Sequence, residues 1–314
     1  MTLAALTNTA FSSSVPYKPY VDLTINTHWN NETNQQEPQD LVVKSAESGV
    51  KNFTLAFITD AGNCQAAWGS QQMYSVNNNW GAHLTDAMRK AGIKYTVAFG
   101  GATGDDMSKA CDDTALLSTY EKILNTYQPS GLDFDIENGS ADVAKIMRTL
   151  TKIQAVHKDV ALSFTLPTLP EGLTTEGINV VKAAHNAGLT FTVNIMAMDY
   201  GPAYNGNMGD YAIQAANSLF AQIKQIAPKK NDAAIWKMIE VTPMIGVNDV
   251  NIEEFKLADA DKLRDFANEK ELNALSIWSF FRDTPCDSKW ASPICSGNNL
   301  QQIPYEYSKH FTAL

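Results

Sequence analysis

Short apolar segments rich in β-branched and aromatic residues alternate along the chain with longer segments of helical periodicity. The short segments predict eight strands, at residues 20–26, 52–59, 95–99, 131–137, 161–166, 191–198, 239–245 and 274–279. The amphipathic segments between them predict helices, among them 114–127, 141–157, 175–187, 211–226 and 259–270. Such alternation favours βαβ units, in which neighbouring strands are parallel.

The number of strands selects among the α/β architectures. Eight strands, with no linker-like break after residue 20, predict one closed (β/α)8 TIM barrel that forms a single domain over residues 20–314. A doubly wound open sheet is the alternative, but the first strand is not followed by the GxGxxG turn of that fold. Residues 1–19 are expected to form an N-terminal arm or linker.

Composition narrows the range of partners. The 314 residues carry 24 basic and 34 acidic side chains, a net charge of −10, without any Lys/Arg-rich run. Nucleic acids and anionic membrane surfaces need a basic footprint, so neither is an expected partner. No stretch approaches the ~20 consecutive apolar residues of a membrane span. We expect a monomer whose ligand is neutral or recognised locally.

The cysteines and the N-terminus bear on the compartment. Two disulfides are possible, Cys286 with Cys295 across a short loop and Cys64 with Cys111 across a longer one. Four free thiols in a cytosolic protein are the alternative. The first 14 residues are polar and lack the basic start and apolar core of a signal peptide. They suggest a linker, or the beginning of a fragment cut from a secreted precursor.

The segment from Ser130 to Glu137 has the most informative pattern. Side chains on a strand alternate between two faces, so Asp133, Asp135 and Glu137 share one face. The leucine, phenylalanine and isoleucine between them suit a face covered by helices. The acids must then point into the barrel, where unpaired charges are costly. We therefore expect this row of acids to have a function.

Close carboxyls cannot all ionise, so their pKa values should be driven apart and one proton retained near neutral pH. A retained proton is the requirement for a general acid. The same row of acids could also belong to a solvent-exposed edge strand or to a Ca²⁺ or Mg²⁺ site. The large apolar residues in between disfavour the edge strand, and a rigid strand offers few carbonyl ligands to a metal ion. No metal is expected.

The segment Gly131–Glu137 resembles the DxxDxDxE signature of family 18 glycoside hydrolases, the chitinases and their relatives. Ser130 stands where that signature begins with Asp, a departure far from the chemistry. Ala98 stands where the SxGG element of the family has Ser. Other predicted strand ends are similar to the family in the same order, over residues 97–102, 165–167, 194–201, 242–249 and 277–283. The resemblance covers about residues 20–307.

This resemblance implies hydrolysis of chitin or N-acetylglucosamine oligosaccharides, with retention and without a cofactor. The nucleophile would be the 2-acetamido group of the substrate rather than a second carboxylate. Glu137 would act as general acid and then as base. Asp135 would hydrogen-bond the acetamido N–H and stabilise the positive intermediate, and Asp133 would set the charge state of Asp135.

Further roles follow from the resemblance at the sixth strand. Asp199 matches the family, whereas Met198 stands where many relatives have a catalytic-site Tyr. Tyr200 is therefore expected to place its hydroxyl in the site. The substrate-binding residues would be Trp278, Met196, Met198, Gly100 and Gly101.

Aromatic side chains suit sugar binding, because a ring face can stack under the apolar face of a sugar. Trp278 would be the floor under the sugar whose acetamido group turns back, although a tryptophan at this position could instead belong to the core. Met196 and Met198 would contact substrate or simply pack in the barrel. Other aromatics are expected in loops, with Trp68 lining a cleft; they are Trp68, Trp80, Tyr204 and Trp290.

Three functions follow from these residues. The first is a secreted, endo-acting chitinase, and the second is a relative that cleaves N-glycan cores. The third is a carbohydrate-binding barrel without catalysis, which is disfavoured because such proteins typically lose the acid and this chain retains Glu137. Reducing-sugar release from colloidal chitin, compared with a glycoprotein, distinguishes the three.

Overall fold

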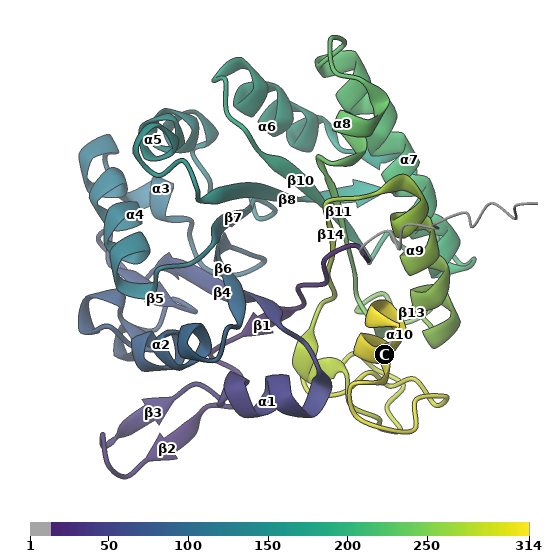
Figure 1. Ribbon diagram of the computed structural model, residues 1–314, viewed down its shortest axis with the longest axis horizontal. Coiled ribbons are helices and arrows are strands. Elements are labelled where there is room, and N and C mark those ends of the chain that lie inside the picture. The colour runs from purple at the N-terminus through teal and green to yellow at the C-terminus, as the bar shows by residue number, and fades with distance from the viewer. Residues whose placement is uncertain (1–13, 314) are drawn as a thin grey trace, which may run out of the picture.

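Eight parallel strands lie at the centre of the molecule, and the longer helices are arranged around them (Figure 1). The computed structural model describes residues 14–313. The strands pair in the order β1, β4, β6, β7, β8, β10, β11, β14. Their bounds in that order are Tyr20–Asp22, Asn52–Asp60, Lys94–Gly100, Gly131–Asp135, Ala161–Leu169, Thr192–Ala197, Ile239–Pro243 and Ala274–Leu275.

The barrel closes between its first and last strands. Tyr17 forms a bridge with Leu275, and the backbone N–H groups of Lys18 and Tyr20 donate to the carbonyls of Leu275 (2.9 Å) and Ile277 (3.1 Å). The predicted (β/α)8 barrel is confirmed. Within the expected N-terminal arm, residues 14–19 contact the barrel, and residues 1–13 lie outside the described residues.

Most of the helices begin at a short polar residue whose side chain accepts a backbone hydrogen bond. The side-chain oxygen of Asp112 accepts from the backbone N–H groups of Thr114 and Ala115 at the start of α4, and Asn207 caps α7 in the same way. The bounds of α1 to α10 are Leu41–Ser48, Ala82–Lys90, Met107–Ala110, Asp113–Tyr127, Val143–Val156, Thr175–Asn186, Met208–Ile226, Asp232–Trp236, Leu257–Lys270 and Glu306–Thr312.

Short strands and 3₁₀ turns lie in the loops at the end of the barrel where the parallel strands finish. The hairpin of β2 (His28–Asn30) and β3 (Gln35–Glu37) projects from the body at the lower left of Figure 1. The remaining short strands are β5 (Ala66–Trp68), β9 (Gly172–Leu173), β12 (Gly246–Val247) and β13 (Glu254–Phe255), and 3₁₀ turns span Gln72–Tyr74, Val76–Asn78 and Phe280–Arg282.

Several strands are shorter than the sequence pattern predicts, among them β1, which ends at Asp22, β7, which ends at Asp135, and β14, which ends at Leu275. Single backbone hydrogen bonds continue beyond these ends: the N–H of Ile136 donates to the carbonyl of Thr165 (3.0 Å), and that of Trp278 donates to the carbonyl of Pro243 (2.9 Å). Glu137 follows β7 in a loop, whereas Trp278 forms an isolated bridge with Met244 at the mouth of the barrel.

The apolar residues of β7 face the helices, as the alternation predicts. Phe134 stacks on Phe99 of β6 with ring centroids 5.1 Å apart, and Tyr120 of α4 packs against both rings. Leu132 is fully buried in the same layer. The acids of β7 consequently point into the barrel.

Both predicted disulfides are present, Cys64–Cys111 and Cys286–Cys295. The expectation that Trp68 lies in a loop and lines a cleft is wrong. Trp68 belongs to β5, which pairs with β4, and its fully buried indole donates to the hydroxyl of Tyr127 at 3.1 Å. Within residues 14–313, the helices are too short or too polar to cross a bilayer.

The other three aromatics that were expected in loops differ in their exposure to solvent. The Trp80 side chain is also buried, and its indole donates to the carbonyl of Gln36 at 2.7 Å, which holds the β2–β3 hairpin. Tyr204 and Trp290 lie in loops as expected, and Trp290 is 68 % exposed.

Candidate active site

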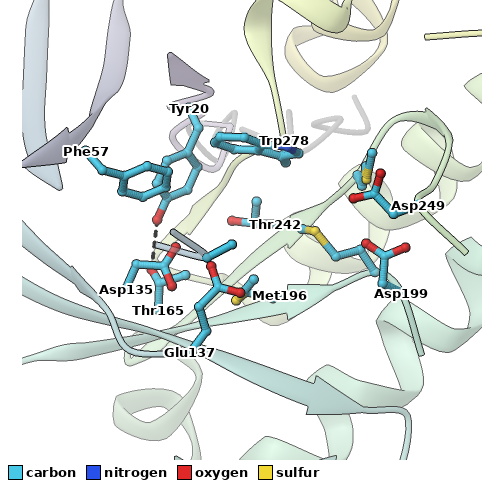
Figure 2. A pocket seen from close by; sticks show the side chains of 13 residues that line it. Tyr20, Phe57, Asp135, Glu137, Thr165, Met196, Asp199, Thr242, Asp249 and Trp278 are labelled. Carbon is cyan, nitrogen blue, oxygen red and sulfur yellow. Dashed lines mark hydrogen bonds between the residues drawn. The ribbon is translucent and has the colours of Figure 1, made fainter. Parts of the chain in front are cut away.

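A cavity of about 230 Å³ opens where the barrel strands end. Figure 2 shows the rings of Tyr20, Phe57 and Trp278 on one side of it and the carboxyls of Asp135 and Glu137 on the other. The remaining side chains that line the cavity come from the loop after β6 and from β8, β10 and β11 with the loops that follow them: Ala102, Thr165, Met196, Met198, Asp199, Thr242, Met244 and Asp249.

Asp133 lies deepest in the acid row and is enclosed by hydroxyl groups. It accepts hydrogen bonds from Tyr20 of β1 (2.7 Å) and from Ser163 (2.5 Å) and Thr165 (2.9 Å) of β8. Ala98, its register partner on β6, supplies no polar group. Burial raises the pKa of Asp133, and the hydrogen bond from Ser163 and the positive charge of Lys18 oppose that rise.

Asp135 and Glu137 form the upper part of the row. Asp135 is buried, and its Oδ1 has no hydrogen-bond partner among the described residues. Burial raises the pKa of Asp135 well above its ordinary value, and the charges of Glu137 and Asp133 and a hydrogen bond with Glu137 raise it further. Neighbouring carboxyls that repel each other do not ionise independently, so this pair binds a proton more tightly than an isolated carboxyl does.

Glu137 is the outer member of this pair and faces the cavity. Burial raises the pKa of Glu137 above its ordinary value; the hydrogen bond with Asp135 opposes the rise and the charge of Asp199 adds to it. Both carboxyls therefore hold a proton more firmly than ordinary carboxyls do, and Glu137 presents its carboxyl group to the cavity. Ser130, the departure from the family signature, lies at the opposite end of β7, where its hydroxyl donates to the carbonyl of Tyr95.

The chain after β10 departs from the expectation for Tyr200. Asp199 has a left-handed backbone conformation (φ 49°), so the strand alternation ends there and both Met198 and Asp199 face the cavity. Tyr200 turns away and packs its buried ring against Tyr204 and Tyr211. Its hydroxyl therefore does not line the cavity.

Asp199 is held by the loop that follows β11. Its Oδ1 accepts from the backbone N–H of Val250 at 2.8 Å, and Asp249 stands beside it at the same side of the cavity (Figure 2). Burial raises the pKa of Asp199, and that hydrogen bond lowers it. Asp249 lies within the motif noted in the sequence, but its place in the loop gave no reason to assign it to the site.

The aromatic side of the cavity includes two residues with no predicted role, Tyr20 and Phe57. The register between β4 and β6 shifts between Leu55 and Ile58, which places Phe57 toward the mouth of the barrel. Its ring stacks on Trp278 with centroids 5.7 Å apart. Regular alternation would have placed Phe57 on the helix-facing side, so nothing in the sequence pattern indicated it.

Gly100 and Gly101 lie behind the cavity and do not line it. A Cβ on Gly100 would stand 2.1 Å from the carbonyl oxygen of Asp135, and one on Gly101 would stand 3.0 Å from the ring of Phe57. The backbone N–H of Gly101 donates to that same Asp135 carbonyl at 3.1 Å. These glycines let β6 approach the acid strand closely.

The polar side chains around the cavity, which could serve as metal ligands, are carboxyls and hydroxyls, and several of them hydrogen-bond to one another. Within residues 14–313, no cluster of three His, Cys, Asp or Glu side chains is arranged to hold a metal ion. Apolar ring faces lie opposite two carboxyls with raised pKa values, an arrangement suited to a sugar ring and to acid–base chemistry at its edge.

The chain matches the model of the glycosyl hydrolases family 18 over residues 25–307. It belongs to that family. The probable bifunctional chitinase/lysozyme of Escherichia coli is 36 % identical over 94 % of this chain, and endochitinase 11 of Metarhizium anisopliae is 36 % identical over 86 %. The chain spans only 34 % and 52 % of the lengths of these two relatives.

The fold and the family agree with a solved structure. Catalytic-site mutants of active domain 2 of the Pyrococcus furiosus chitinase, complexed with chito-oligosaccharides, share 32 % identity and a TM-score of 0.84 with this chain. The match covers 96 % of each chain. The class defined by this site is therefore a chitinase-like glycoside hydrolase.

Proposed function

We propose that this protein hydrolyses β-1,4-N-acetylglucosaminide bonds of chitin, with Glu137 as the general acid and base. The observation that carries the proposal is the placement of the Asp135 and Glu137 carboxyls across one cavity from the ring of Trp278. The chito-oligosaccharides bound to the Pyrococcus furiosus relative support the substrate class.

In the proposed mechanism the sugar to be cleaved lies on Trp278, and Glu137 gives its proton to the glycosidic oxygen. The 2-acetamido oxygen of that sugar attacks C1, and the bond to the leaving group breaks with retention. Asp135 accepts a hydrogen bond from the acetamido N–H, which orients this nucleophile, and its negative charge stabilises the cationic ring that forms.

The buried row of acids has a role in this sequence of steps. When the substrate binds, Asp135 turns from Glu137 to the acetamido N–H, and the proton stays on Glu137 until Glu137 gives it to the glycosidic oxygen. The hydroxyls of Tyr20, Ser163 and Thr165 stabilise negative charge on Asp133 beneath Asp135. Glu137 then takes a proton from the water that hydrolyses the intermediate.

The Glu137→Gln variant tests the assignment. Glutamine preserves the shape but has no proton to give, so we expect kcat on N-acetylglucosamine oligomers to fall by about 10²–10⁴-fold. Binding of the oligomer should persist. Glu121→Gln is the matched control, because Glu121 lies on α4, half exposed and paired with His157. Near wild-type turnover by Glu137→Gln contradicts the mechanism.

The substrate itself is tested with colloidal chitin and an N-linked glycoprotein, measuring released reducing sugar. Release from chitin supports the proposed function, and release only from the glycoprotein indicates a relative that cleaves N-glycan cores. Binding to chitin without release from either substrate indicates a carbohydrate-binding barrel. Secretion, endo action and retention remain parts of this proposal.

A further inference from the structure

Arg282 is a buried cation that the proposed mechanism does not use. It ends the 3₁₀ turn Phe280–Arg282, shortly after Trp278 in the chain, and it is only 2 % exposed. Arg282 forms no ion pair with any described residue, and its Nε has no hydrogen-bond partner among them. Taking an unpaired charge out of water costs free energy. Its retention at that cost indicates a role beyond packing.

The guanidinium of Arg282 joins backbone carbonyls of two different loops. Nη2 donates to the carbonyls of Ile245 (2.8 Å) and Val247 (2.7 Å), in the loop after β11. Nη1 donates to the carbonyl of Ser292, in the loop after β14 that a disulfide closes. A planar guanidinium presents several donors in a fixed fork, which the single ammonium group of a lysine does not reproduce.

The loop after β11 carries one wall of the catalytic cavity. Met244 and Asp249 line the cavity from this loop, and Met244 forms a bridge with Trp278. The two carbonyls that Arg282 holds lie between Met244 and Asp249 in the chain. A displacement of the loop would therefore move both of these lining side chains.

Asp199 depends on the same loop, although it follows a different strand. Its Oδ1 accepts from the backbone N–H of Val250 at 2.8 Å, and its own N–H donates to the side-chain oxygen of Asn248 at 3.4 Å. The side-chain amide of Asn248 in turn donates to two carbonyls within the loop, at 2.9 and 3.0 Å. The loop that Arg282 holds is therefore the loop that positions Asp199.

Carboxyl groups surround Asp199, and Arg282 opposes them. Asp199 faces the carboxyls of Asp249 and Glu253, and its charge acts on Glu137. The charge of Arg282 lowers the pKa of Asp199. Burial lowers the pKa of Arg282 to about 10, and the charges of Asp249 and Asp199 oppose that fall. The guanidinium therefore stays protonated over the pH range in which these carboxyls titrate.

We infer that Arg282 is a positioning residue of the catalytic site: its guanidinium fork holds the loop after β11, and with it Asp199 and Asp249, at the cavity wall (Figure 2). This inference rests on the proposed function, because it gives Arg282 a part in the same reaction. Arg282 does not line the cavity itself. It acts through Asp199, whose charge raises the pKa of Glu137.

The Arg282→Lys variant tests this inference. Lysine keeps the positive charge but not the fork, so the protein should fold while the loop after β11 becomes freer. We expect backbone hydrogen exchange over residues 244–250, followed by mass spectrometry, to become about tenfold faster. Arg264→Lys is the matched control, because Arg264 of α9 also donates to a backbone carbonyl, that of His310 (2.6 Å), and does not line the cavity. Exchange over residues 244–250 should be unchanged in the control.

The pH profile of kcat/KM separates positioning from a purely structural role. In Arg282→Lys the freer loop no longer holds Asp199 near Glu137, so the pKa of Glu137 falls and the alkaline limb should move down by about half a pH unit. Adding Arg282→Lys to Asp199→Asn should move the limb no further than Asp199→Asn alone, since both changes act through the same carboxyl. Faster exchange with an unmoved limb would make Arg282 a structural residue only and overturn the inference.

A second variant and a binding measurement complete the test. Arg282→Met removes the buried charge together with the fork and should show the same two changes, including where Arg282→Lys does not fold. Hydrogen exchange does not depend on activity, so unchanged exchange overturns the inference whether or not the wild type hydrolyses chitin. If the wild type is inactive, the proposed function fails. Faster exchange with weaker binding of the N-acetylglucosamine hexamer, measured by calorimetry, then still supports the inference, and faster exchange with unchanged affinity overturns it.

Discussion

Buried carboxyl groups lie at both ends of the barrel, and their surroundings differ. At the end where the strands begin, Glu240 pairs with Lys18 at 2.7 Å and accepts hydrogen bonds from Thr192 and Asn273. At the opposite end, Asp135 forms no ion pair with any described residue, and the charges of Glu137 and Asp133 raise its pKa. A buried carboxyl that is paired with a cation stays ionised. A buried carboxyl without a cation has a raised pKa and keeps its proton to a higher pH.

The Asp135→Asn variant tests the end of the barrel where the buried carboxyl has no cation, and it should have the largest effect. We expect kcat to fall about 10³-fold, or about 4 kcal/mol, because an amide cannot stabilise the positive intermediate. The free energy of unfolding in urea should stay equal or rise, since an amide carries no buried charge. A clear loss of stability would show that Asp135 supports the fold as Glu240 does.

The Lys18→Met variant tests the end of the barrel where a buried carboxyl is paired with a cation. It leaves Glu240 without its cation, so the free energy of unfolding should fall by about 3–5 kcal/mol in a urea titration. Adding Glu240→Gln should recover most of the loss, because the unpaired charge is then removed. If Lys18→Met is as stable as the wild type, the two ends do not differ as proposed.

The Asp199→Asn variant should have the smallest effect of the three. It tests whether the charge of Asp199 acts on Glu137 at the mouth of the barrel. The charge of Asp199 raises the pKa of Glu137. Without it, Glu137 loses its proton more readily and its pKa falls, so the alkaline limb of the kcat/KM profile should move down by about one pH unit. Asp232→Asn, on the surface helix α8, is the control, and its profile should coincide with that of the wild type. An unmoved limb in Asp199→Asn would mean that Asp199 does not act on Glu137.

The pattern of apolar and polar positions predicts the eight strands and the inward row of acids. Both features depend on local periodicity, which a sequence displays directly, whereas the two disulfides were suggested by the positions of the cysteines. Asp135, Glu137, Met196 and Trp278 come together at one cavity because parallel strands finish at the same end of a barrel. The sequence is sufficient where strand order and alternation decide the position of a side chain.

Other positions depend on single irregularities of the backbone. The register shift in β4 brings Phe57 into the cavity, and the left-handed conformation of Asp199 turns Tyr200 out of it. Trp68 is buried because β5 folds back onto β4 as an extra antiparallel strand. A bulge, a positive φ angle and an inserted strand each change the face of a residue without changing the hydrophobic pattern.

The closure of the barrel has a consequence for the order in which this molecule is assembled. The hydroxyl of Ser276 donates to the carbonyl of Lys18 across 258 residues of chain, and Tyr20 and Trp278 meet at the same cavity. Contacts between such distant residues require the chain to close a long loop, which costs conformational entropy. The cavity is complete only when the last strand has docked on the first, so activity recovered on refolding should report completed folding.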